Sequence, residues 1–237
     1  MKIAPNIHII PGVTANPYLL VDPDGLTLID TGIPGSANKI LRYIKQAGYS
    51  LRDLNRILLT HADYDHAGSL AALKKATGAR VYASLYEARA VAIGKFPRSL
   101  KTDNIFLKPV FALAERLGRI SPAHVDEHLY DGQVLPVLNG LHVVDTKGHT
   151  PGHLSFFASS VGILFSGDSI LSVNKQLVGS HGSVTWDQGK ADAAVLKQLA
   201  LRARIVCSGH GEVVMDGLYR LLKLAEVLAV SPVYQRL

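Results

Sequence analysis

The chain has 237 residues, of which 48% are hydrophobic and 19% are charged, and it contains 21 Gly and 11 Pro. This composition is typical of an ordered globular protein and excludes a disordered polypeptide, collagen and a coiled coil. The length is near the upper end of what one hydrophobic core supports, so we predict a single domain over residues 1–237. No apolar run approaches the roughly 20 residues that cross a bilayer, so we expect no membrane association.

The charged residues give the chain a basic character. The 25 Lys and Arg residues exceed the 19 Asp and Glu residues, and the formal net charge is +6. The basic residues are scattered, without a dense block or interleaved aromatic residues, so we expect no nucleic-acid partner. The N-terminal residues MKIAPNIHIIPG lack the apolar segment of an export signal, and Cys207 is the single cysteine. Both observations favour a cytoplasmic location.

Strands and helices alternate in the first half of the sequence, which predicts an α/β fold class. Two strands at 18–21 and 26–30 flank a turn that contains Pro23 and Gly25, so they form a hairpin. The further elements, in chain order, are a helix capped by Ser36, a strand at 56–60, a helix that ends at Gly78, a strand at 80–83, and a helix opened by a capping box of Ser84 and Glu87.

The stretch 94–126 shows no clear period, because Pro97, Pro109 and Pro122 interrupt its apolar and aromatic residues. We predict that it is an insertion that forms a lid or wall over a cleft. A contact between the two copies of a homodimer is the alternative.

Strands return in the second half of the sequence. They are predicted at 134–138, 141–146, 154–159 and 162–166, with Asn139-Gly140 as a hairpin turn between the first two. Asp192 then opens a helix, residues 204–207 form a strand, and Asp216 opens the last helix.

Four potential metal ligands lie within six positions of one short segment: His61, Asp63, Asp65 and His66. Alternate side chains of an extended segment share a side, so the first three can converge, and a turn into a helix brings His66 alongside them. Two carboxylates and two imidazoles placed so close together favour a bound cation that compensates their charge. The alternative is a turn with a helix cap, in which Asp65 accepts backbone N–H bonds.

Further ligand-type residues follow later predicted strands. His149, Asp168 and His210 each lie next to a glycine, which lets the backbone turn sharply and direct the side chain into a shared cleft. Any one of them alone is explained as a turn residue, but their recurrence favours a metal centre. His153 is expected to support the turn before the strand at 154–159.

This pattern resembles the metallo-β-lactamase superfamily, whose motif H-x-H-x-D-H is followed by a His, an Asp and a last His. The residues that match are His61, Asp65, His66, His149, Asp168 and His210, and residues 28–32 (LIDTG) resemble the family's I-D-T-G element. The resemblance implies a four-layer αββα sandwich. It also implies one metal ion at His61, Asp63 and His149, a second at Asp65, His66 and His210, and a bridging Asp168.

The sequence departs from the family at Asp63, where most members have histidine. A carboxylate makes the first position more anionic and harder, which favours Fe or Mn relative to Zn. We expect two divalent ions, with Zn favoured and Fe or Mn as alternatives.

The resemblance implies a metal-dependent hydrolase in which a metal-bound hydroxide attacks a small ester, thioester, lactone or lactam. Asp65 is the candidate catalytic residue, because the family assigns this position a role in orienting the hydroxide and relaying a proton. The turn at 148–153 (GHTPGH) resembles glyoxalase-II-like and lactonase-like members. A non-haem di-iron oxidoreductase, a metal-dependent phosphodiesterase and a non-catalytic metal-stabilised protein remain alternatives. A second D-T/S-G turn is missing from the sequence, so Asp30 is expected to have a structural role rather than that of an aspartic-protease residue.

Overall fold

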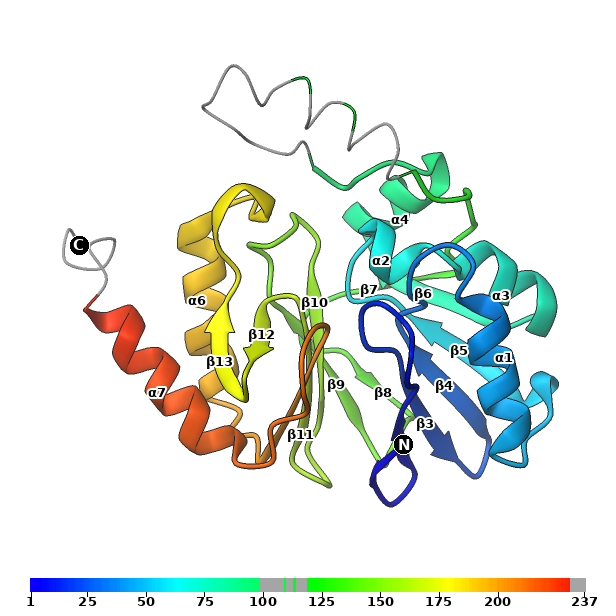
Figure 1. The fold of residues 1–237 in the computed structure, drawn as a ribbon, viewed down its shortest axis with the longest axis horizontal. Coiled ribbons are helices and arrows are strands. Elements are labelled where there is room, and N and C mark those ends of the chain that lie inside the picture. The colour runs from blue at the N-terminus through cyan, green and yellow to red at the C-terminus, as the bar shows by residue number, and fades with distance from the viewer. Residues whose placement is uncertain (99–108, 110–112, 114–118, 231–237) are drawn as a thin grey trace. The chain divides into compact units, whose positions relative to one another are not determined.

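The computed structural model describes residues 1–98, 109, 113 and 119–230 (Figure 1). The chain divides into two compact units, Met1–Tyr130 and Asp131–Leu237. Each unit has a sheet and helices of its own, so the α/β character predicted from the sequence holds in both. The single domain predicted over 1–237 stays a prediction.

The unit Met1–Tyr130 contains a sheet of seven strands within the described residues, in the order β1-β2-β3-β4-β5-β6-β7. The strands from β1 to β4 pair antiparallel, whereas those from β4 to β7 pair parallel. Their bounds are β1 Lys2–Ala4, β2 Ile7–Ile9, β3 Tyr18–Asp22, β4 Gly25–Ile29, β5 Leu54–Leu58, β6 Arg80–Ser84 and β7 Glu127–Leu129. The parallel strands β4 and β5 end at the same edge of the sheet.

The predicted hairpin is confirmed in β3 and β4. Asp22 pairs with Gly25, which leaves Pro23 and Asp24 as a two-residue turn. Gly25 has φ +129°, and a Cβ at this position would collide with the Asn55 side chain and the Asp53 carbonyl. The turn therefore requires glycine.

Within the described residues, the helices of this unit are α1 Ala37–Gln46, η1 Leu51–Asp53, α2 Tyr64–Ala67, α3 Leu70–Thr77 and α4 Leu85–Ile93. Ile40 and Ile44 are one turn apart on α1 and are fully buried in the same core as Leu28 and Ile57 of the sheet. α3 ends at Gly78, as predicted, and this glycine has a left-handed backbone conformation. Ser36 stands at the N-cap of α1 but makes no side-chain capping bond, so that part of the prediction is wrong.

The predicted capping box of α4 is only half formed. The Ser84 hydroxyl accepts a hydrogen bond from the Glu87 amide at 3.4 Å. The Glu87 carboxylate, which is fully buried, accepts instead from the amide of Ala62 at 2.8 Å. A buried donor needs a partner, and this carboxylate therefore supports the loop that follows β5.

The unit Asp131–Leu237 contains, within its described residues, a sheet of five strands in the order β14-β11-β10-β9-β8 and a hairpin of β12 and β13. β11 and β14 pair parallel, and the other neighbours pair antiparallel. Their bounds are β8 Val134–Leu135, β9 Leu141–Asp145, β10 Leu154–Ala158, β11 Ile163–Gly167, β12 Ile170–Val173, β13 Gln176–Gly179 and β14 Ile205–Ser208. The predicted strands are present, but Val134–Leu135 is shorter than expected, and its connection to β9 spans 136–140.

The helical segments of this unit are η2 Gly182–Val184, α6 Gln188–Leu199 and α7 Gly217–Ala229. α6 and α7 lie side by side (Figure 1), and Val195 and Leu221 from these helices share a core with Leu164 and Val206 of the sheet. The prediction that Asp192 opens α6 is wrong. Asp187 is the N-cap, and its side chain accepts from the Lys190 amide at 3.1 Å.

The structure describes only part of the insertion predicted at 94–126. Of the insertion predicted at 94–126, residues 99–108, 110–112 and 114–118 lie outside the described residues, so the lid or wall, and the dimer contact that is its alternative, stay predictions. Among the helices that the structure describes, none combines the length and the apolar character needed to cross a bilayer.

Candidate metal centre

The first set of predicted ligands follows β5 in the unit Met1–Tyr130. Asp30, just after the parallel neighbour β4, holds the start of this loop: its carboxylate accepts hydrogen bonds from the Thr60 amide at 2.9 Å and from the Thr60 hydroxyl at 2.8 Å. Asp30 is 2% exposed. It ties the ends of two strands together, in agreement with the structural role predicted for it.

The same network fixes the two imidazoles of this unit. Nδ1 of His66 donates to Oδ2 of Asp30 at 2.8 Å, because a carboxylate only accepts. The Thr60 hydroxyl gives its proton to Asp30, so it accepts from Nδ1 of His61, at 2.9 Å. Both rings therefore carry the proton on Nδ1 and present the lone pair of Nε2, which is the arrangement found in metal-binding histidines. The two ring centroids lie 4.0 Å apart.

Asp63 lies at the N-cap position of α2, and its side chain is held by an arginine that sequence reasoning missed. Arg98 forms a two-pronged ion pair with it, with Nη1–Oδ1 at 2.5 Å and Nη2–Oδ2 at 2.9 Å. The Arg98 side chain is 2% exposed. Oδ2 of Asp63 also lies 3.6 Å from Nε2 of His61. No local pattern in the sequence links positions 63 and 98, so only the fold reveals the pair.

Asp65 and His66 are successive residues of α2. Asp65 is partly buried and His66 is fully buried. A ligand atom of Asp65 lies within 4.8 Å of one of His66. Ligand atoms of His61 also lie within 4.8 Å of ligand atoms of Asp63 and of His66. The four predicted ligands of this unit therefore converge.

The second set of predicted ligands lies in the unit Asp131–Leu237. Oδ2 of Asp168, after β11, is 3.8 Å from Nε2 of His149 and 3.4 Å from Nε2 of His210. Nδ1 of His149 shares a hydrogen bond with the Ser180 hydroxyl at 2.8 Å, and Ser180 in turn contacts the Thr185 hydroxyl at 2.7 Å. One carboxylate oxygen thus faces two imidazole nitrogens.

The spacing of these donor atoms fits a shared ion. Bonds of about 2.0–2.2 Å to a tetrahedral ion place its ligand atoms about 3.3–3.6 Å apart. The three imidazole–carboxylate separations, 3.6 Å in the first set and 3.8 and 3.4 Å in the second, are close to that spacing and longer than a hydrogen bond. The imidazole and carboxylate donors also suit Zn, Fe and Mn.

His153 has a supporting role at two turns: the predicted one before β10, through Thr146, and the turn that carries Asp168. Its Nε2 accepts from the amide of Asp168 at 3.0 Å, so the ring proton is on Nδ1 and is donated to the Thr146 hydroxyl at 2.8 Å. Both ring nitrogens are thus engaged, and the residue is fully buried. His153 positions the turn that carries Asp168 and is not itself a ligand.

The backbone before His149 is constrained by close packing. Gly148 has φ +149°, and an added Cβ would collide with the backbone of Ala191 in α6. The amides of Trp186 and Asp187 donate to the carbonyls of His149 and Gly148, each at 3.0 Å. The loop that carries His149 is therefore held against the start of α6.

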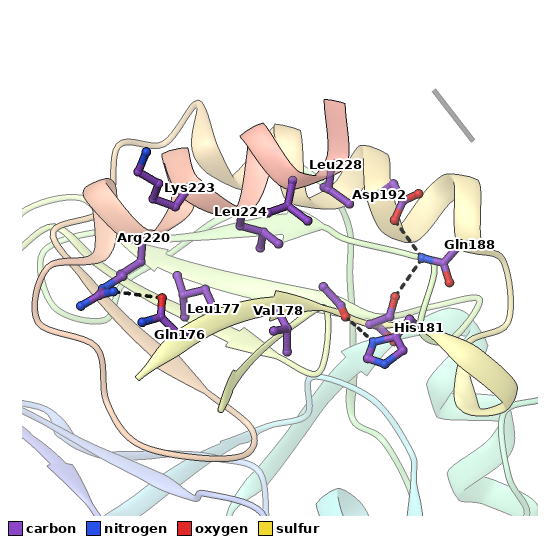
Figure 2. A pocket seen from close by; sticks show the side chains of 13 residues that line it. Gln176, Leu177, Val178, His181, Gln188, Asp192, Arg220, Lys223, Leu224 and Leu228 are labelled. Atoms are coloured by element: carbon purple, nitrogen blue, oxygen red, sulfur yellow. Dashed lines mark hydrogen bonds between the residues drawn. The ribbon is translucent and has the colours of Figure 1, made fainter. Parts of the chain in front are cut away.

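A cavity of about 570 Å³ lies between β13, α6 and α7 (Figure 2), and none of the predicted ligands lines it. Its lining is largely apolar and includes Leu177 and Leu224. Ser180 also lines it, and the Gln188 amide links the Ser180 carbonyl, at 3.0 Å, to the Asp192 carboxylate, at 2.8 Å. The residue that holds His149 is therefore itself anchored from α6.

Three residues outside the predicted ligand sets have structural explanations. Trp186 is half-buried, and the Lys190 ammonium lies 4.3 Å from its ring centroid. His181 is exposed and bonds to the Gly179 carbonyl at 3.0 Å. Cys207 is fully buried on β14, and burial raises the pKa of its thiol well above the usual range.

Comparison with known proteins identifies the family. The model of the metallo-beta-lactamase superfamily matches residues 10–210, and the chain therefore belongs to this superfamily. It is 28% identical over 231 residues to a protein of Bacillus subtilis named probable metallo-hydrolase YflN, with 89% of this chain and 85% of the relative covered. It is 27% identical to the hydroxyacylglutathione hydrolase GloC of Haemophilus influenzae, with 87% and 91% covered.

The solved structures agree on the fold. A metallo-beta-lactamase family protein of Thermus thermophilus superposes with a TM-score of 0.73 at 23% identity, covering 96% of this chain and 80% of the other. The predicted metallo-β-lactamase-like fold is therefore confirmed. The relatives indicate that the protein is an enzyme, and they support the predicted glyoxalase-II-like branch.

Proposed function

We propose that the protein is a dinuclear metal-dependent hydrolase that cleaves a small ester, thioester, lactone or lactam. The observation that carries this proposal is the orientation of His61 and His66, whose Nδ1 atoms are both occupied by a hydrogen-bond network centred on Asp30. Such outer bonds fix the Nε2 atoms for coordination. Relatives named as a metallo-hydrolase and as hydroxyacylglutathione hydrolases support the reaction class.

The proposed ligand sets are those that the resemblance to the superfamily implies. One ion is assigned to His61, Asp63 and His149, a second to Asp65, His66 and His210, and Asp168 bridges the two. Divalent ions in such sites lower the pKa of bound water toward neutrality and polarise the bond to be cleaved.

Asp65 is the proposed catalytic residue. In the hydrolysis, water adds to the carbonyl carbon, the bond to the leaving oxygen, sulfur or nitrogen breaks, and the leaving group needs a proton. The Asp65 carboxylate orients the attacking water and relays its proton to that group. Its place on α2, directly before His66, supports this role.

Zn is the favoured ion. The carboxylate at position 63 was the reason to weigh Fe or Mn, and with them an oxidoreductase, because it makes the site harder. The guanidinium of Arg98 offsets that negative charge. Fe and Mn therefore remain alternatives, but Asp63 gives them no additional support. The scattered basic residues likewise give no support to a phosphodiesterase.

The proposal includes a small-molecule substrate and a cytoplasmic location. A single cysteine in the sequence suits a reducing compartment. It includes no nucleic-acid or membrane partner, since the basic residues form no dense block.

Elemental analysis of the purified protein, followed by a panel of ester, thioester, lactone and lactam substrates, tests the function. We expect close to two ions per chain, turnover of at least one substrate class, and loss of that turnover after chelation with recovery on adding the metal. His66→Ala should lose most of the metal, whereas His124→Ala, at an imidazole whose side chain is 81% exposed, should keep it. A metal content unchanged by His66→Ala contradicts the ligand assignment.

A further inference from the structure

The ion pair between Arg98 and Asp63 gives the metal position of His61 and Asp63 an unusual electrostatic setting. The guanidinium side chain is 2% exposed and the Asp63 side chain is 10% exposed. A charge removed from water in this way is very costly unless a partner neutralises it. Asp63 supplies that partner with both carboxylate oxygens, at 2.5 and 2.9 Å. The pair as a whole is electrically neutral.

The pairing leaves Asp63 able to bind an ion, but with less attraction for it. Each carboxylate oxygen has two lone pairs, and the two-pronged contact with arginine uses one on each. Coordination through the remaining lone pairs is compatible with the 3.6 Å separation from Nε2 of His61. A cation bound there, however, is repelled by the positive charge of Arg98, which lies next to its ligand Asp63.

The set around His66 has the opposite setting. Nδ1 of His66 donates to the Asp30 carboxylate at 2.8 Å, whereas Nδ1 of His61 donates to the neutral hydroxyl of Thr60. A carboxylate behind an imidazole raises the basicity of the coordinating nitrogen. Asp65 adds a further carboxylate to this set. The position of His66 therefore has the negative charges of two carboxylates, Asp30 and Asp65. At the position of His61, the negative charge of Asp63 is balanced by Arg98.

We propose that Arg98 weakens the metal position of His61 and Asp63, so that the two ions bind in sequence and the position of Asp65 and His66 fills first. This inference rests on the two-ion centre of the proposed function. Arg98 acts through Asp63 and is a positioning residue. The repulsion between one unit of positive charge and a divalent ion a few ångströms away, at an effective dielectric constant near 20, exceeds the free energy of a tenfold difference in affinity, so we expect a difference of about tenfold or more.

Titration of the metal-free protein with Zn²⁺ against a competing chelator tests the proposal. We expect two binding steps in the unaltered protein, separated by about tenfold or more. Arg98→Gln removes the charge, so the weaker step should tighten by about tenfold and approach the stronger one. Arg98→Lys keeps the charge and should preserve the separation. Arg89→Gln, at an exposed arginine of α4, is the matched control for the change in net charge and should leave both steps unchanged.

Asp63→Asn supplies an independent measurement. It removes the negative charge of the ligand at position 63 and should abolish the weaker binding step. The affinity of the stronger step should stay within about threefold of its value in the unaltered protein. Thermal unfolding followed by circular dichroism checks that each variant is folded, and Arg98→Lys keeps the test decisive if Arg98→Gln does not fold. Equal affinities in the unaltered protein, or a separation unchanged by Arg98→Gln, overturns the inference but leaves the proposed function standing. Failure to bind any of Zn²⁺, Fe²⁺ and Mn²⁺ overturns the proposed function itself.

Discussion

The two sets of candidate ligands are supported by different chemistry. In the unit Met1–Tyr130 two supporting groups are charged: the Asp30 carboxylate holds His66, and the Arg98 guanidinium holds Asp63, while the Thr60 hydroxyl holds His61. In the unit Asp131–Leu237 the group that holds His149 is the neutral hydroxyl of Ser180. The first set should therefore respond most to changes in charge, and the second to changes in geometry.

The largest effect is expected from Asp30→Asn. An amide keeps the shape but cannot accept all three hydrogen bonds that the carboxylate accepts from Thr60 and His66. We expect about a tenfold to hundredfold loss of metal affinity and a loss of about 2–4 kcal/mol in the free energy of unfolding, because buried donors lose their partner. Chelator competition and urea denaturation measure the two effects.

The control for Asp30→Asn is Asp24→Asn, at a carboxylate whose side chain is 52% exposed and paired with Arg56. It should change the free energy of unfolding by less than about 1 kcal/mol. Unchanged metal affinity in Asp30→Asn would refute the idea that charged support distinguishes this unit.

Gly148→Ala tests the geometric sensitivity of the other unit. The new Cβ would collide with the backbone of Ala191, at a φ of +149° that side chains rarely adopt. We expect a loss of about 2–3 kcal/mol in the free energy of unfolding and weaker metal binding through displacement of His149. Gly12→Ala is the matched control, since Gly12 also has a positive φ, +73°, but no atom within 4 Å of the added Cβ. Equal effects of the two substitutions would mean that backbone strain alone, rather than the contact with α6, is responsible.

Ser180→Ala should have a smaller effect. It removes the hydroxyl that bonds to His149 and Thr185 without changing a charge. Metal affinity should fall by about tenfold, at the low end of what outer hydrogen-bond partners contribute, and the free energy of unfolding by about 1 kcal/mol. The loss of metal affinity in Ser180→Ala can then be compared directly with the loss in Asp30→Asn. If Ser180→Ala weakens metal binding more than Asp30→Asn does, the contrast between charged and neutral support is wrong.

The smallest effect concerns acid, which should not distinguish the two units. Burial alone would raise the pKa of Asp126, but its hydrogen bonds with the Lys74 ammonium and the Val81 amide lower it overall. Asp131 in the other unit follows the same balance, with Lys197 as its partner. A carboxyl with a lowered folded-state pKa stabilises the fold above its unfolded pKa and loses that contribution as the pH falls through the folded value. Asp126→Asn should therefore be less stable than the unaltered protein at pH 7, and urea denaturation at decreasing pH should show the difference shrinking. A difference that grows in acid contradicts the sign.

The sequence predicted the elements that carry strong local signals. The hairpin of β3 and β4 was predictable because Pro23 and Gly25 define its turn. The hairpin of β12 and β13 was missed because its turn residues are Asn174 and Lys175, both with positive φ, and lysine conceals the usual Asn-Gly signal. The start of α6 was misplaced because no apolar residue marks its first turn after Asp187.

The candidate site shows the same limit. The ligands at 61–66 were recognisable from their density in the sequence, and His149, Asp168 and His210 from their glycine neighbours and the family pattern. Arg98 could not be found this way, because an ion pair that joins distant positions leaves no periodic trace. Its position was within the stretch 94–126, interpreted from the sequence only as an insertion. The fold, not the local pattern, supplies the partner of Asp63.

The burial of Cys207 has a practical consequence. Its thiol is fully enclosed, and burial raises its pKa, so very little reactive thiolate exists in the folded protein at neutral pH. As the single cysteine of the chain, it can be alkylated only when β14 is released. The rate of labelling by a thiol reagent therefore reports how often this part of the protein opens, without any engineered probe.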